Sequence, residues 1–307
     1  MSLMRKLLLA TIVFFCTISN SYFFKVSSFV ERLKELFMIL RKKTFSLLIL
    51  SLGGGLLGFW FVWANSQHPK VVDSKIGEEL VHLSLIMDGN RRWAANNGKL
   101  AGEGHYQGAL AIRKAVDFCL AEGIKHLSLY AFSLENLNRS QEEKRDLFDL
   151  IPKFFEKYSE ELLAKKVRIR FIGDRNLFPL EATHCITQIE KITNDCDSLN
   201  VYFMFFYGGQ QEIIAGMKKI GEKIKAGEVE PEAISQAFFE QQLWSVGVPD
   251  PDLLIRFGGR KRLSNFLPFK LGYTELCFLD NFWPDVNEKI LKKCCQDFLI
   301  VGRTFGH

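Results

Sequence analysis

Residues 80–93 read LVHLSLIMDGNRRW, an apolar run that ends abruptly in a cluster of charged and amide side chains. The run Leu80–Met87 predicts a buried strand, and the Asp-Gly-Asn that follows is a turn signal. An acid at the end of a buried strand can bind a divalent metal, and Gly89 lets a ligand approach the backbone closely. The two arginines that follow are suited to gripping a diphosphate. Read alone, this segment is a structural turn more often than a site.

From residue 78 onward, expected strands alternate with expected helices. Strands are expected at 80–87, 125–132, 167–172, 200–207, 253–257 and 274–279, and helices at 104–121, 141–165, 181–195, 210–225 and 287–301. Strands that alternate with helices predict an α/β fold, with a central, mostly parallel sheet covered on both faces. Ligands of such sheets bind at the carboxyl ends of the strands.

Two more strand ends carry polar clusters. Ser133-Leu134-Glu135-Asn136-Leu137-Asn138-Arg139 follows one expected strand, and Arg256 is followed by Gly258-Gly259-Arg260-Lys261-Arg262-Leu263-Ser264-Asn265 after another. The second cluster is a candidate phosphate cradle, or else a solvated basic loop. Glu275 lies on the last short strand, where an acid could reach a shared metal. Together the three clusters supply acids for Mg2+ and arginines for diphosphates, and this combination is far more specific than any one of them.

The first 66 residues differ in character from the rest and predict a membrane-associated segment, joined to residues 80–307 by a linker at 67–79. Apolar stretches occupy 7–24 and 45–64, and the second is long enough to span a bilayer. Arg41-Lys42-Lys43 precedes that stretch, and Trp60 and Trp63 lie near its end, as interfacial anchors do. The alternatives are a signal peptide for the first stretch and a core helix for the second.

Composition narrows the choice of partners. The net charge of +5 is too small to indicate nucleic acid, and it would suit an anionic small substrate or an anionic membrane surface. Seven cysteines show no zinc-ligand spacing and favour small buried side chains in a reducing compartment. Phe is abundant, with 28 residues, which fits a Phe-rich core or the lining of an apolar cavity.

Seven separated motifs resemble those of the cis-prenyltransferases, the family of undecaprenyl and dehydrodolichyl diphosphate synthases. They are HLSLIMDGNRRWA (82–94), GHYQGA (104–109), YAFSLENLNRS (130–140), IRFIGD (169–174), YGGQQEI (207–213), DLLIRFGGRKRLSNF (252–266) and YTELCFLDNFWPD (273–285). They occur in family order across residues 80–307, and a joint match of this kind is far more specific than a single motif.

The resemblance implies a fold with a hydrophobic tunnel, a homodimer, and Mg2+-dependent condensation of isopentenyl diphosphate with an allylic diphosphate such as farnesyl diphosphate. Asp88 and Glu275 would be the metal ligands, and Asp88 and Asn136 would take part in catalysis. Because an amide is a poor base, Asn136 is better regarded as an orienting group. The implied substrate-binding residues are Gly89, Asn90, Arg91, Arg92, Trp93, His105, Ser133, Glu135, Arg139, Arg256, Arg262 and Ser264.

Several positions depart from the family pattern: Ala101, Leu137 and Gln210 replace an arginine, an aromatic residue and an arginine, and Arg260 replaces a glutamate. These departures leave two functions open. The chain is an active elongase tethered to membrane lipid by its N-terminus, or a non-catalytic member that serves as a partner subunit or binds lipid. Because the diphosphate substrates are cytosolic, we expect the domain on the cytoplasmic face of the membrane, although the basic cluster beside a single span would place it outside.

Overall fold

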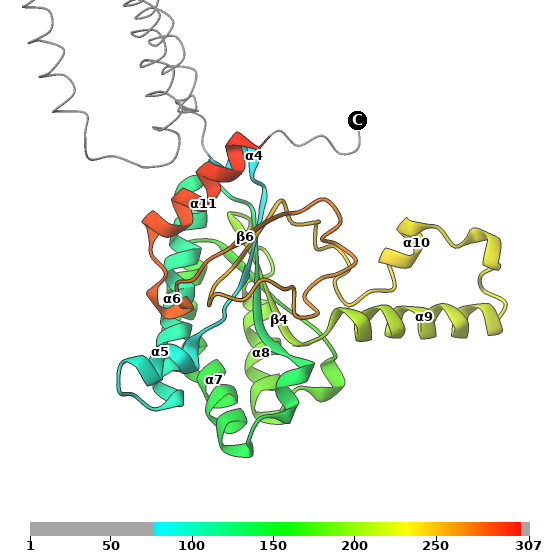
Figure 1. Cartoon of the computed structure of the whole chain (residues 1–307). Helices are drawn as coiled ribbons and strands as arrows, with labels where there is room; N and C mark the ends of the chain where they lie inside the picture. The colour runs from blue at the N-terminus through cyan, green and yellow to red at the C-terminus, as the bar shows by residue number, and fades with distance from the viewer. Residues whose placement is uncertain (1–75, 302–307) are drawn as a thin grey trace, which may run out of the picture. The chain divides into compact units, whose positions relative to one another are not determined.

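A computed structural model of the chain describes residues 76–301, which form one six-stranded sheet with helices packed on it (Figure 1). The strands are β1 (His82–Ile86), β2 (His126–Ser133), β3 (Val167–Ile172), β4 (Leu199–Tyr207), β5 (Leu253–Arg256) and β6 (Glu275–Phe278). All neighbouring strands are parallel, in the order β3-β4-β2-β1-β5-β6. The predicted parallel sheet is therefore confirmed, and each expected strand is present to within a few residues.

The helices lie where amphipathic patterns predicted them, with shorter ones between. They are α4 (Ile76–Glu79), α5 (Asn90–Asn96), α6 (Ala101–Glu122), α7 (Gln141–Ala164), α8 (Leu180–Ile192), α9 (Gly209–Lys225), α10 (Gln236–Glu240) and α11 (Glu288–Ile300). Four 3-10 turns are η1 (Leu134–Asn138), η2 (Arg175–Leu177), η3 (Pro231–Ala233) and η4 (Trp283–Asp285). Local chemistry sets several ends: the Asn287 side chain caps the start of α11, and α6 stops at Gly123, whose φ is 78°.

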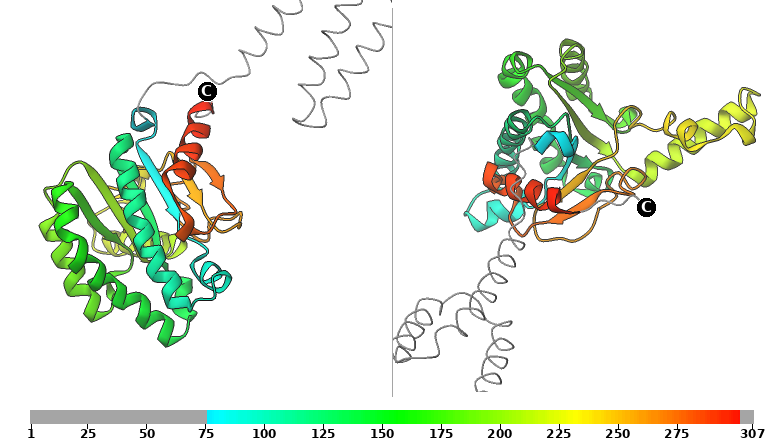
Figure 2. Two further views of the ribbon diagram at one scale, coloured as in Figure 1. Left: turned by 90° about the vertical axis from the view of Figure 1, so that its left-hand side faces the viewer. Right: turned by 90° about the horizontal axis from the view of Figure 1, so that it is seen from above.

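The two faces of the sheet are covered differently. Side chains of α6, α7, α8 and α11 pack against one face in a single large apolar cluster. The opposite face is covered mainly by two segments, one between α10 and β5 with Trp244 and Val248, and one between β5 and β6 with Phe266. Helices thus flank the sheet chiefly on one side, while α9 and α10 project away from it (Figures 1 and 2). The expectation that both faces of the sheet are covered is confirmed, but irregular segments rather than helices cover the second face.

The predicted membrane stretches at 7–24 and 45–64, and most of the linker at 67–79, lie outside the described residues. Within residues 76–301, none of the helices combines the length and the apolar character needed to cross a bilayer.

Candidate active site at the carboxyl end of the sheet

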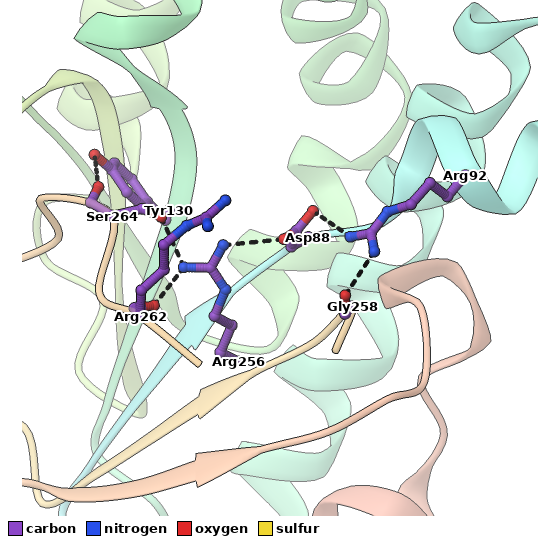
Figure 3. Close-up of polar contacts among 7 residues, drawn as sticks. All are labelled: Asp88, Arg92, Tyr130, Arg256, Gly258, Arg262 and Ser264. Carbon is purple, nitrogen blue, oxygen red and sulfur yellow. Dashed lines mark hydrogen bonds and ion pairs between the residues drawn. The ribbon is translucent and has the colours of Figure 1, made fainter. Parts of the chain in front are cut away.

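The carboxylate of Asp88 is shared by two arginines that come from different elements (Figure 3). Oδ1 accepts a hydrogen bond of 3.0 Å from Arg92 in α5, and Oδ2 accepts one of 3.0 Å from Arg256 at the end of β5. Arg92 also donates to the carbonyl oxygen of Gly258 at 2.7 Å. Because the Arg256 side chain is only 4% exposed, Asp88 is the counter-charge of a nearly buried cation.

Strand register brings these residues together. β1 and β5 are neighbours, and Ile86 pairs with Arg256, so Asp88 leaves the sheet beside the end of β5. Gly89 then turns the chain into α5 with a φ of 108°, a left-handed value that favours glycine. A Cβ at Gly89 would also lie 2.6 Å from the Phe282 ring. The Asp-Gly-Asn motif is therefore both the turn that the sequence indicates and part of the site.

The loop after β5 holds a second group of polar atoms. Arg256 donates to the Ser264 hydroxyl at 2.7 Å and to the carbonyl oxygen of Arg262. Tyr130 donates to the carbonyl oxygen of Ser264 at 3.1 Å (Figure 3). Ser264 has a φ of 51° and Asn265 a φ of 63°, so two successive non-glycine residues adopt left-handed backbone. Strain of this kind collects at functional sites, where surrounding contacts maintain it.

Asn265 supplies much of that support. Its side-chain Nδ2 donates to Glu135 and to Gln211, both at 2.9 Å, and its Oδ1 accepts from the backbone of Gln210 at 2.8 Å. Its carbonyl oxygen accepts from Gly209 at 2.9 Å. One amide thus ties the loop after β5 to η1 and to the start of α9, which fixes the position of Ser264.

A third group surrounds Glu143 in the first turn of α7. Its carboxylate lies 3.2 Å from His105 Nε2, 3.3 Å from Arg139 and 3.8 Å from Arg91. The pattern Ser140-x-x-Glu143 predicts a capping box, in which the glutamate would reach back to the helix start. Only the Ser140 half forms, with Oγ accepting from the backbone of Glu143 at 3.2 Å. The Glu143 carboxylate instead contacts His105, Arg139 and Arg91, a role that the sequence pattern does not indicate.

Burial affects the titration of this group. Desolvation lowers the pKa of His105 below its usual value, and the nearby Arg139 and Arg91 lower it further, while Glu143 opposes them. His105 is therefore a neutral imidazole at neutral pH. Desolvation also lowers the pKa of Arg139, whose guanidinium nevertheless stays charged. The wall of the site thus presents fixed cations and one neutral imidazole.

These groups line the mouth of a cavity of about 710 Å³. The predicted residues on its wall are Asp88, Gly89, Asn90, Arg91, Arg92, His105, Ser133, Asn136, Arg139, Arg256, Arg262 and Ser264. The deeper wall is apolar and includes Ile112, Leu147, Phe154, Phe171 and Phe203. A cavity with a cationic mouth and an apolar interior fits an anionic head joined to a hydrocarbon tail.

Three predicted residues lie elsewhere. Trp93 is outside the cavity wall and donates from its indole to Asp285 at 2.7 Å. Glu135 is also outside the wall and accepts from Asn265. Glu275 begins β6 and pairs with Leu253 at the start of β5, so it lies toward the opposite end of the strands from Asp88. The strand rise of about 3.3 Å per residue keeps these two carboxylates well apart within one chain.

The donor set suits a Mg2+ ion that a single protein carboxylate shares with a substrate. Within residues 76–301 no three His, Cys, Asp or Glu side chains gather closely enough to form a metal cage. Mg2+ often binds through one or two carboxylates plus substrate phosphates. Asp88 lies at the cavity mouth and is 29% exposed, and incoming phosphates would compete for its two arginine partners.

The glycines of GHYQGA let α5 approach α6 closely. A Cβ at Gly104 would lie 2.2 Å from the backbone oxygen of Asn90, and one at Gly108 would lie 2.6 Å from the Asn90 side chain. Gly108 also accepts a hydrogen bond of 2.7 Å from the buried Trp283 indole. These contacts hold the helix that carries Arg91 and Arg92 against the one that carries His105.

Comparison with known proteins agrees with this geometry. The prenyltransferase family model described as undecaprenyl diphosphate synthase matches residues 86–306. A ditrans,polycis-undecaprenyl-diphosphate synthase of Micrococcus luteus, specific for (2E,6E)-farnesyl diphosphate, is 37% identical over 73% of this chain and 90% of its own. A tritrans,polycis-undecaprenyl-diphosphate synthase of Methanopyrus kandleri, specific for geranylgeranyl diphosphate, is 35% identical over 78% and 90%. The crystal structure of lavandulyl diphosphate synthase from Lavandula x intermedia with dimethylallyl diphosphate has a TM-score of 0.72 at 31% identity, covering 74% of this chain and 98% of that one.

Replacing Gly104 by Ala tests the role of close helix packing. The added methyl group would collide with the Asn90 backbone, so we expect a loss of stability of about 1–3 kcal/mol and a raised KM for the allylic substrate. Gly102→Ala is the matched control, because its Cβ would meet only the Asp146 carboxylate, at 3.2 Å. Thermal unfolding and kinetics of both variants measure the effect, and equal behaviour of the two would contradict it.

Proposed function

Because this chain belongs to the undecaprenyl diphosphate synthase family of prenyltransferases, we propose that it condenses isopentenyl diphosphate with an allylic diphosphate to form a cis-polyprenyl diphosphate. It is a transferase, as the members of this family are. The observation that carries the proposal is the Asp88 carboxylate between Arg92 and Arg256, at the cationic mouth of a deep apolar cavity.

The allylic diphosphate is held in this proposal by the α5 side of the mouth. Arg91, Arg92 and His105 bind its phosphates, with Gly89 and Asn90 at the start of α5, while its hydrocarbon part enters the apolar interior. In this proposal isopentenyl diphosphate is held by Arg256, Arg262 and Ser264, together with Arg139 and Ser133, which line the same cavity. This division places the two reacting ends together at the cavity mouth.

The reaction breaks the bond between the allylic carbon and oxygen, and the diphosphate leaves with the electron pair. The double bond of isopentenyl diphosphate then attacks the allylic cation, and loss of a proton to the released diphosphate gives the new cis double bond. Fixed arginines near the leaving group stabilise the charge that develops there. Asn136 orients the reacting group, because an amide cannot act as an effective base.

Mg2+ is the proposed cofactor, bound by Asp88 together with substrate phosphates. When bound, such an ion would neutralise charge on the diphosphate and polarise its oxygens. Glu275 of the same chain is not part of this proposal, because strand register places it away from Asp88.

We propose farnesyl diphosphate as the allylic starter and a product such as undecaprenyl diphosphate, in line with the named specificity of the Micrococcus luteus relative. The Methanopyrus kandleri relative is named for geranylgeranyl diphosphate, so the assay below includes both starters.

We also propose that the apolar N-terminal stretches attach the enzyme to membrane lipid, with residues 80–307 on the cytoplasmic face. A long polyprenyl product partitions into lipid, at about 0.8 kcal/mol for each buried CH2 group. The substrates are cytosolic, which favours a domain on that side.

A homodimer is the proposed assembly, with α9 as the contact. Ile214, Met217 and Ile224 are exposed on this projecting helix, and their spacing, with Gly221 between, follows one helical stripe. Helices pair through stripes of this period, so a second copy of α9 is the partner that fits.

Product analysis tests the proposed reaction. The purified protein with farnesyl or geranylgeranyl diphosphate, labelled isopentenyl diphosphate and Mg2+ should form elongated products. Asp88→Asn should lower kcat/KM about a hundredfold or more, because the carboxylate for the metal is lost. Asp280→Asn is the control, since Asp280 is exposed near the same end of the sheet but outside the cavity wall, and it should leave turnover unchanged. A parent protein without product from either starter would instead favour a partner subunit or a lipid-binding protein.

Protease protection in sealed inverted vesicles tests the membrane proposal. With the cytoplasmic face outward, residues 80–307 should be digested without detergent. Protection of this domain until detergent is added would show that it lies on the other side.

Sedimentation tests the dimer, which should have twice the monomer mass of 35.3 kDa. Met217→Lys should shift the equilibrium toward monomer because it places a charge in the α9 stripe. An unchanged dimer would move the interface elsewhere.

A further inference from the structure

The apolar cavity follows one face of the sheet away from the reactive end. Phe203 and Phe205 of β4, and Phe171 of β3, lie on its wall, and Phe171 pairs with Phe203 in the sheet register. Alternate residues of a strand share one face, so the next pair toward the amino end is Ile169 and Val201. A chain that grows at its diphosphate end would push its older end in this direction.

A second, much smaller cavity of about 10 Å³ lies on that path. Ile169 and Val201 line it, and it shares Ile112, Phe154 and Phe203 with the large cavity. The two cavities therefore adjoin at these three apolar residues, which form the partition between them. Phe154 lies on α7 and packs on Tyr158 of the same helix with ring centroids 4.9 Å apart, so the partition continues along α7.

Beyond the partition, four charged side chains join α6 to α7, and we name them the clasp: Arg113, Asp117, Glu161 and Lys165. Arg113 donates to both carboxylate oxygens of Glu161, at 2.7 and 2.8 Å. Lys165 donates to Asp117 and to Glu161, both at 2.6 Å. All four residues line the small cavity. The clasp is thus the polar end wall of the apolar path.

The charges of the clasp support one another. Hydrogen bonds from Arg113 and then Lys165 lower the pKa of Glu161, and the bond to Glu161 raises the pKa of Arg113. The Arg113 guanidinium also lies over the Tyr158 ring, 4.4 Å from its centroid. The Arg113 Nε atom is buried and has no hydrogen-bond partner among the described residues. Displacing such a group would break several charge-assisted bonds.

We infer that the clasp is the stop that limits product length. The inference rests on the proposed chain-elongation function and adds the residues that end it. An apolar chain end that has passed Phe154 gains nothing by entering this row of three linked ion pairs, because it would separate the charges without offering a hydrogen bond. Elongation ends when the older end of the product reaches this wall.

Other ion pairs of the described chain provide a contrast. Lys292 of α11 and Glu122 at the end of α6 form an ion pair of 3.0 Å. Like the clasp, this ion pair bridges two helices. Neither residue lines either cavity. If the clasp only fastened helices together, the loss of either bridge would have similar consequences. If the clasp is a stop, only the loss of the clasp changes the chain length of the product.

The test replaces the central pair with residues of similar length in the double variant Arg113→Met with Glu161→Gln. Lys165 and Asp117 remain paired, and the Met side chain keeps contact with Tyr158. Product chain length is measured by chromatography after incubation with starter, Mg2+ and labelled isopentenyl diphosphate. The expected result is a distribution longer by one or more five-carbon units, while Glu122→Gln keeps the parent distribution. An unchanged distribution in the double variant would overturn the inference.

Binding provides a readout that does not need turnover. Polyprenyl phosphates of increasing length are titrated into the parent and the variants, and the length at which affinity falls is recorded. Consider the shortest polyprenyl phosphate for which the affinity of the parent has fallen. The double variant should bind this ligand at least tenfold more tightly than the parent does. If the parent forms no product, equal length limits in this titration still refute the clasp, and a longer limit in the variant still supports it. If the double variant unfolds, the single variant Glu161→Gln takes its place. If only Phe154→Ala binds longer polyprenyl phosphates than the parent, the stop is the partition and the inference about the clasp is wrong.

Discussion

The shared carboxylate of Asp88 is the interaction on which the site depends. Arg256 is nearly buried at the end of β5, and a buried cation is tolerated only with a close counter-charge. The same carboxylate positions Arg92, whose other contact is the carbonyl oxygen of Gly258 in the loop after β5. One side chain therefore holds together the ends of β1 and β5 and the first turn of α5. Because parallel strands end at the same edge, residues 168 positions apart in the sequence meet here.

The cavity divides its chemistry along the direction of the strands. Cations and hydroxyl groups gather at the mouth because the loops and helix starts at the carboxyl ends can solvate them. The interior is apolar because alternate residues of β3 and β4 face α6 and α7, where Phe and Ile fill the space. The far end becomes polar again where α6 and α7 reach solvent and the clasp joins them. The head, body and end wall of the cavity thus follow from one sheet face and two helices.

The sequence predicted what depends on local pattern. Period-two strands and amphipathic helices predicted the parallel sheet, and polar strand ends predicted that Asp88 and Arg256 meet at one edge of it. His105 and the apolar cavity were implied only by the resemblance to the cis-prenyltransferases, and the structure places all three residues on one cavity. Long-range register decided the rest. Glu275 reads as an acid on a short strand, but its pairing with Leu253 places it away from Asp88. Glu143 reads as half of a capping box, and its contact with His105 depends on how α6 meets α7. Arg113 and Glu161 read as ordinary solvated helix charges, since no local pattern shows that they close a cavity.

The departures from the family pattern have a common location, which bears on whether the chain is catalytic. Ala101, Leu137, Gln210 and Arg260 are all exposed, and none of them lines the cavity. In contrast, Asp88 keeps its contact with Arg256, and His105 keeps its contact with Glu143; both contacts need defined distances and partial burial. A member kept only for binding a partner would have no need to maintain a nearly buried arginine, a left-handed Ser264 and an apolar cavity behind them. Departures that all lie off the cavity wall leave the reacting groups in place, and this arrangement is the one expected of an active enzyme.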